Sequence, residues 1–255
     1  MKNLKKLFGI LVVFIAVTSC SSDSSTSQNT MKILAKATYT NVANKSGSGQ
    51  VMNADVVLTS FTINIKEIEF KLAESEGDDN NDNSGSDDNG QGDDNHDGMY
   101  NGDDEVKLNG PWELNLLNQS APITTVTIAN GTYEEVEFKL NKSLVSTSPM
   151  YNKTVEIRGT INGTPFVFWH DFEQEFEIDY DNSAQNLVVN NGSFDLVFNF
   201  DLNQVLSQVD LSSALDGNGN GVIEIGPDDT DGNNALAQSL NDHIEDATEM
   251  EDQDD

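Results

Sequence analysis

The chain has 255 residues and a net charge of −31 at neutral pH, with 44 acidic side chains against 13 basic ones. So little positive charge cannot neutralise a phosphate backbone, which excludes nucleic acid as a partner and disfavours docking of the protein surface on anionic lipids. A single cysteine, Cys20, excludes an internal disulfide and a cysteine metal site. The length suits one large β domain.

The first twenty residues predict a lipoprotein signal. Three lysines precede an apolar run over residues 7–17, which is short for a membrane span, and small residues lead to Cys20. This terminus resembles that of Gram-negative lipoproteins, in which residues 1–19 would be removed and Cys20 would carry acyl chains. Loss of the three lysines would bring the net charge from −31 to −34. The alternatives are an ordinary signal peptide with a free cysteine, or an uncleaved anchor.

Composition divides the mature chain into four parts. Residues 20–31 form a Ser-rich tether and residues 32–247 a β domain, whose insert at 74–105 holds 13 acidic residues and no Lys or Arg. Such an insert buries too little apolar surface to fold and is expected to be disordered. Residues 248–255 predict a frayed acidic tail.

Alternation of apolar and polar residues predicts about ten short strands and a mainly β fold, an antiparallel β-sandwich. The expected strands are residues 33–42, 56–72, 112–117, 125–128, 133–140, 155–161, 165–170, 172–180, 187–189 and 194–200. Within 56–72 the apolar phase changes near Lys66, which predicts a β-bulge. Apolar residues spaced three and four apart predict two short C-terminal helices, at 205–215 and 236–247.

Three segments carry a family resemblance: WELNLL at 112–117, NGTYEEVEFKL at 130–140 and EIRGTINGTPFVFW at 156–169. Together with the signal, they resemble bacterial outer-membrane lipoproteins that carry a β-sandwich or transthyretin-like domain of unknown function. The resemblance implies a non-enzymatic envelope protein and assigns no active residues. It places the chain at the outer membrane, facing the periplasm or the cell surface.

Calcium is the one cofactor to which the sequence points, and the acidic insert holds the first candidate loop. Oxygen ligands recur at Asp93, Asn95 and Asp97, a glycine follows, and Asp104 closes the twelve-residue span. Aspartate in place of the usual closing glutamate favours weak affinity or Mg²⁺. The alternative is a disordered, solvated acidic loop, because a segment built from Asp, Asn, Gly and Ser matches such a pattern easily.

A second candidate loop lies between the predicted helices. Asp216, Asn218 and Asn220 alternate ahead of a glycine, and Val222 would supply a main-chain carbonyl. A proline occupies the twelfth position, so Asp228 or Asp229 would have to curl back to close the site. The alternative is a Gly/Asn turn without an ion. A bound ion would be structural, with a dissociation constant on the order of 10⁻⁴ to 10⁻³ M.

Catalytic motifs are missing from the sequence. The three histidines are scattered, there is no serine elbow, and the period-two carboxylates of residues 173–179 share one solvated face. Trp169, within an apolar strand, is expected in the core, whereas an exposed aromatic pair in a groove would favour sugar binding.

The sequence therefore predicts a lipid-anchored, non-enzymatic structural or binding module, with a protein or glycan as the unknown partner. The alternative is a surface lipoprotein that captures a glycan or nutrient for an outer-membrane transporter.

Overall fold

The structure, a computed structural model, describes residues 29–40, 53, 55–73, 100–101, 105–179, 187–190 and 192–253. Several residues singled out in the sequence lie outside these ranges: the lipidation residue Cys20 and the first calcium set, Asp93, Asn95, Asp97 and Asp104.

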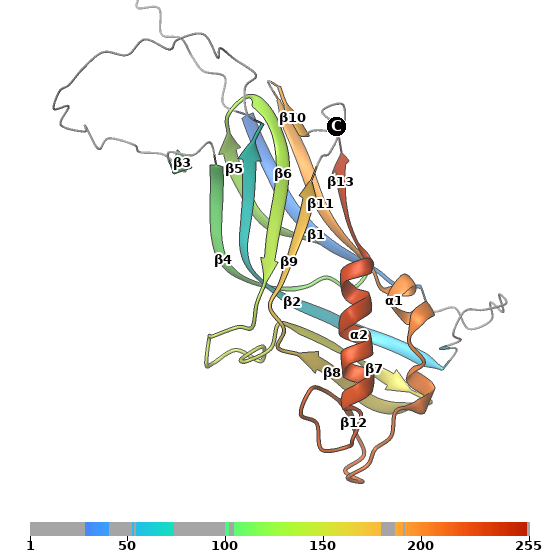
Figure 1. Cartoon of the computed structure of the whole chain (residues 1–255). Helices are drawn as coiled ribbons and strands as arrows, with labels where there is room; N and C mark the ends of the chain where they lie inside the picture. Colours follow the sequence, from blue (N-terminus) through green and yellow to red (C-terminus); the bar gives the residue numbers. More distant parts are fainter. Residues whose placement is uncertain are drawn as a thin grey trace, which may run out of the picture.

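Two β-sheets enclose one core, and the described chain is mainly β, as predicted (Figure 1). The smaller sheet has the strand order β13-β11-β1-β5. Its strands are β13 (Thr248–Gln253), β11 (Ser193–Asp201), β1 (Asn29–Thr38) and β5 (Ser120–Ile128).

The larger sheet has the order β10-β6-β2-β7-β8-β12, with β4 on β2, β3 on β4 and β9 on β6. Its strands are β10 (Leu187–Val189), β6 (Gly131–Leu140), β2 (Val56–Leu72), β7 (Val155–Ile161), β8 (Thr164–His170), β12 (Ile223–Ile225), β4 (Glu105–Asn115), β3 (Tyr100–Asn101) and β9 (Gln174–Asp179).

β2 is the strand that joins the parts of this sheet. It pairs with β7 through its first half and with β6 through its second half, while β4 runs along its other edge. The change of partner coincides with a register shift between Ile65 and Glu67. The β-bulge predicted near Lys66 from the apolar phase is therefore confirmed.

Aromatic side chains from both sheets fill the core. The rings of Phe138 on β6 and Phe198 on β11 lie 4.3 Å apart between centroids, and those of Phe61 and Phe200 lie 5.5 Å apart. All four side chains are buried. Ring packing of this kind adds about 0.5–1.5 kcal/mol per pair beyond the area buried, which fixes the two sheets against each other.

Two features correct the sequence prediction. The sandwich is not wholly antiparallel, because β1 runs parallel to β11 and β12 runs parallel to β8. The tail predicted to fray at 248–255 contains β13, which pairs with β11 through residues 248–253. Charge composition predicted a solvated tail, but strand pairing is made by the backbone and requires only an open sheet edge.

Both predicted helical regions are present, as α1 (Leu202–Gln208) with a following 3-10 turn at Leu211–Ser213, and α2 (Asn234–Asp246). Asp201 caps α1 by accepting the N–H groups of Asn203 and Gln204. α2 buries Ala237, Leu240 and Ile244 and packs against β8 and β12. In the described ranges, no helix has the length and apolarity needed to cross a bilayer.

The close pairing of β2 with β7 depends on a glycine. A Cβ atom at Gly159 would lie 2.0 Å from the carbonyl oxygen of Val57, so Gly159→Ala should destabilise the fold by about 1–3 kcal/mol through overpacking. Gly192→Ala is the matched control, because its Cβ would make only an ordinary 3.6 Å contact. Urea unfolding of both variants measures the difference, and equal stabilities would contradict this account of the β2–β7 contact.

Candidate functional site

The loop between the 3-10 turn and α2 is folded around the carboxylate of Asp216. Asp216 Oδ1 accepts the N–H groups of Gly219 and Asn220 at 2.8 and 3.1 Å, and Oδ2 accepts that of Gly221 at 2.9 Å. Gly219 and Gly221 have φ angles of 74° and 89°, in the left-handed region that glycine adopts without strain. One aspartate therefore holds the whole turn.

The other predicted cation ligands lie in the same turn. Asn218 Oδ1 accepts the N–H of Asn220 at 2.9 Å, and Asn220 Oδ1 accepts that of Val222 at 2.8 Å. Within the part of the chain that the structure describes, no three Asp, Glu, His or Cys side chains converge on a possible metal position. Calcium binding here stays a prediction, and it would depend on amide and main-chain oxygens beside Asp216.

Asp229, Asp231 and Asn233 brace this loop, and of these only Asp231 carried no expectation from the sequence. Asp229 Oδ1 accepts three successive N–H groups, of residues 231, 232 and 233, at 2.7–3.0 Å. Asp231 accepts the N–H groups of Asn218 and Glu224, and the Asn233 amide bridges the carbonyls of Leu215 and Glu224. The available signal was the run of Asp, Thr, Gly and Asn immediately before an apolar helix, which is typical of turns and caps.

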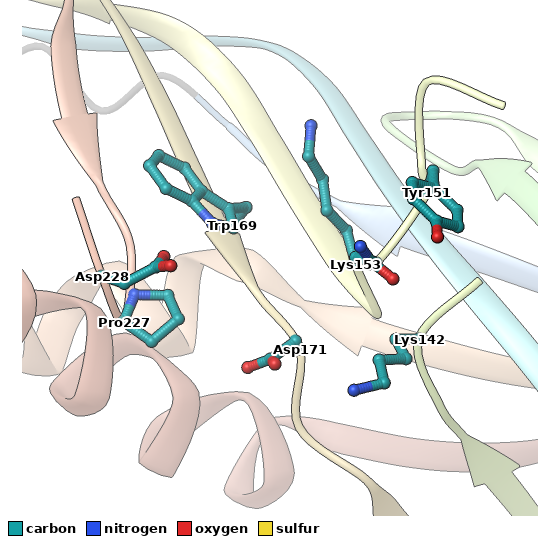
Figure 2. A pocket seen from close by; sticks show the side chains of 8 residues that line it. Lys142, Tyr151, Lys153, Trp169, Asp171, Pro227 and Asp228 are labelled. Carbon is teal, nitrogen blue, oxygen red and sulfur yellow. The ribbon is translucent and has the colours of Figure 1, made fainter. Parts of the chain in front are cut away.

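Asp228 differs from these acidic residues. Its side chain is exposed and lines a neighbouring pocket (Figure 2), whereas the adjacent Asp229 turns into the loop and binds the backbone. Asp228, one of the two residues predicted to close a calcium loop, thus belongs to a different surface.

The pocket has a volume of about 470 Å³ and is formed by three segments far apart in the sequence: the loop 141–154 between β6 and β7, the end of β8, and the turn 226–228. Its lining residues are Lys142, Tyr151, Asn152, Lys153, Trp169, Asp171, Pro227 and Asp228.

Trp169 forms one wall of the pocket, and its predicted place in the core is wrong. Phe166 and Phe168 are buried in the core, while Trp169 lies on the opposite face of β8, half-buried and in register with Glu156 of β7. The turn at Gly226 packs directly on the indole, since a Cβ there would lie 2.3 Å from Trp169 Cζ2. Side chains alternate between the two faces of a strand, so Trp169 lies on the face opposite to that of Phe166 and Phe168. Because β8 is aromatic on both faces, the sequence alone did not reveal which residues face the core.

The opposite wall, the loop 141–154, is fixed by Glu113 of β4. Glu113 accepts hydrogen bonds from the hydroxyls of Ser143, at 2.5 Å, and Ser148. Main-chain bonds then link Ser143 with Asn152 and Lys153, each at 2.9 Å. These contacts set the positions of Lys142 and Tyr151 at the pocket, although the loop has no regular secondary structure.

The two lysines of the pocket differ in their surroundings. Lys153 pairs with Glu156, which also accepts a 2.6 Å hydrogen bond from Arg158 Nε. Burial on its own would raise the pKa of Glu156, but the hydrogen bonds from Arg158 and Lys153 outweigh it and hold the pKa below its usual range. The ammonium group of Lys142 makes no ion pair within the described residues.

Neither acidic side chain of the pocket has a cationic partner within the described residues. The nearest basic nitrogen to Asp171 is Nδ1 of His170, at 3.9 Å, and this nitrogen accepts the N–H of Phe172 and so carries no proton. Asp228 makes no hydrogen bond or ion pair there. The pocket therefore combines aromatic rings, hydrogen-bond donors on Lys142 and Asn152, and free carboxylate acceptors.

A second hollow, of about 630 Å³, lies on the other side of the loop 141–154 and shares Lys142 with the first. It is more apolar, with Pro111, Leu144 and Val145 in its lining, and Leu144 is 77 % exposed. The loop thus separates a polar pocket from an apolar one.

Comparisons with protein-family models, curated proteins and solved structures find no match for this chain. The resemblance to outer-membrane lipoproteins stays a prediction.

The buried His170 stands between the pocket residues Trp169 and Asp171 in the sequence. Its titration predicts how the stability of the fold depends on pH. Burial lowers the pKa of His170 below its usual 6.5, against the opposing effects of Asp171 and Asp242. The unfolded chain therefore binds a proton more readily than the folded one, so this contribution to stability is complete above pH 6.5 and declines as the pH falls. His170→Asn keeps an acceptor for the Phe172 N–H without the titration. Urea unfolding across this pH range should show the stability difference between the two proteins shrinking on acidification; a constant difference would contradict the assignment.

The calcium prediction for the Asp216 loop is tested by thermal unfolding with EDTA and then Ca²⁺. At about ten times a dissociation constant of about 1 mM, Ca²⁺ should add about 1.4 kcal/mol to the stability of the folded chain. Asp216→Ala should lower stability by about 1–2 kcal/mol, because the N–H groups of Gly219 and Gly221 lose their acceptor and that of Asn220 keeps only Asn218, and it should also abolish the calcium effect. Asp210→Ala, which removes a similar cap from the 3-10 turn, should keep it. A melt unchanged by Ca²⁺ would identify the loop as a turn only.

Proposed function

We propose that the protein is a lipid-anchored, non-enzymatic binding module of the bacterial cell envelope, and that the pocket beside Trp169 captures a carbohydrate. The observation that carries the proposal is that two aromatic side chains from separate segments, Trp169 and Tyr151, line one pocket, with Lys153 between them (Figure 2). Tyr151 is 45 % exposed, so its ring is accessible to a ligand. Two aromatic side chains in the lining of one pocket support sugar binding.

The polar lining supports a polyhydroxylated ligand. A sugar hydroxyl both donates and accepts hydrogen bonds, so a single ring satisfies donors such as Lys142 and acceptors such as Asp171 together. Its C–H faces pack on aromatic rings. A wholly apolar ligand would instead remove water from the charged groups without replacing their hydrogen bonds, at a cost of about 1–3 kcal/mol for each.

The proposed anchor would keep this pocket close to a membrane. The first strand begins at Asn29, nine positions after Cys20. A fully extended chain spans at most about 3.6 Å per residue, so nine steps reach roughly 32 Å. A domain held on so short a connection takes its ligand at the membrane surface, which suits capture of a glycan from the envelope or from outside it.

Trp169→Ala tests the proposal. Loss of the indole should weaken binding of the best saccharide by about tenfold, because stacking and its buried area are lost. The measurement is a glycan array with the purified full chain in mild detergent, followed by calorimetric titration. Trp112→Phe is the control, since Trp112 lies on β4 against the core and away from the pocket. No binding to any saccharide, or equal binding by Trp169→Ala, would contradict the proposal.

A further inference from the structure

We infer that the pocket selects saccharides that carry a free, protonated amino group. This rests on the carbohydrate-binding function proposed above and names the class of sugar that the charge arrangement favours.

The first observation is the pair of carboxylates without cationic partners. Asp171 and Asp228 are both exposed, both line the pocket, and neither forms an ion pair with a protonated group in the described part of the chain. By contrast, glutamates on the sheet surface have cationic partners: Lys107 and Lys139 each contact several of them, among them Glu67 and Glu69. Free carboxylates in a pocket favour a ligand that brings its own positive charge.

The second observation is the position of Trp169 beside these carboxylates. In Figure 2, Asp228 lies next to the indole and Asp171 projects from the same strand end. A cation near an indole face is attracted by the ring quadrupole, most strongly of all the aromatic side chains. An ammonium group in this corner therefore gains from the ring and from charge-assisted hydrogen bonds to Asp171 and Asp228.

The third observation is the place of the lysines. Lys153 pairs with Glu156, whereas Lys142 makes no ion pair with any residue that the structure describes. Lys142 comes from the loop 141–154, on the far side of the pocket from Trp169 (Figure 2). It is placed to donate to a hydroxyl or ring oxygen while the amino group lies at the carboxylates. The net charge of −31 attracts cations over longer distances and adds to the preference.

A matched pair of ligands tests the inference. Tetramers of β-1,4-linked glucosamine and N-acetylglucosamine share ring and linkage, but only the first is cationic below the pKa of its amines. Titration of the full chain in mild detergent should give about tenfold tighter binding of the glucosamine tetramer. The double variant Asp171→Asn with Asp228→Asn should bind both tetramers alike.

The control variant is Asp55→Asn with Glu177→Gln, which removes the same charge elsewhere. Asp55 contacts Asn162 at the opposite end of the β7–β8 hairpin, and Glu177 is exposed on β9. This variant should keep the preference; an equal loss in both variants would mean that net charge alone attracts the amine and would overturn the inference.

Two further outcomes separate the inference from the function on which it rests. Equal binding of the two tetramers by the unaltered chain, or tighter binding of a uronic acid tetramer through Lys142, would overturn amine selection and leave carbohydrate binding standing. Absence of binding by these and by neutral saccharides would remove the proposed function itself.

Discussion

The bulge in β2 is the constraint on which the rest of the structure depends. Before it, Ile63 pairs with Val155 of β7; after it, Glu67 pairs with Lys139 of β6. The chain that leaves β6 at this point must return as β7 beside it, so the loop 141–154 emerges where β2 changes partner. A bulge bends and twists its strand. Here it lies between the half of β2 that pairs with β6 and the half that pairs with the β7–β8 hairpin, which carries Trp169. The pocket lies at that junction.

Much of the fold could be predicted because it follows from local pattern. The phase change at Lys66 located the bulge, and the ranges 56–72, 155–161 and 187–189 match β2, β7 and β10. Parallel pairing of β1 with β11 could not be predicted, since alternation says which face a residue takes but nothing about its partner strand. The acidic end of the chain was misassigned for a related reason, because β13 depends on a backbone edge that exists only in the folded sheet.

The candidate pocket could be predicted only in part. The Asp216 turn was visible as a spacing of Asp, Asn and Gly, whereas the meeting of Tyr151, Trp169 and Asp228 depends on three segments brought together by the fold. The two sites are physically connected, because the loop that Asp216, Asp229 and Asp231 hold together contains the turn at Gly226 that packs on Trp169. The carboxylates of Asp216, Asp229 and Asp231 accept backbone N–H groups, and through these bonds they position a wall of the pocket.

The position of β1 also has a consequence for how the chain is made. β1 lies between β5 and β11, and Thr30 has its parallel partner at Ser193. The smaller sheet therefore cannot assemble until residue 193 and those after it have left the ribosome, and closing a loop of that length slows folding. Until then the apolar face of β1, with Met31, Ile33 and Ala35, remains uncovered. The smaller sheet, and with it the core between the two sheets, is therefore completed only when most of the chain has been synthesised.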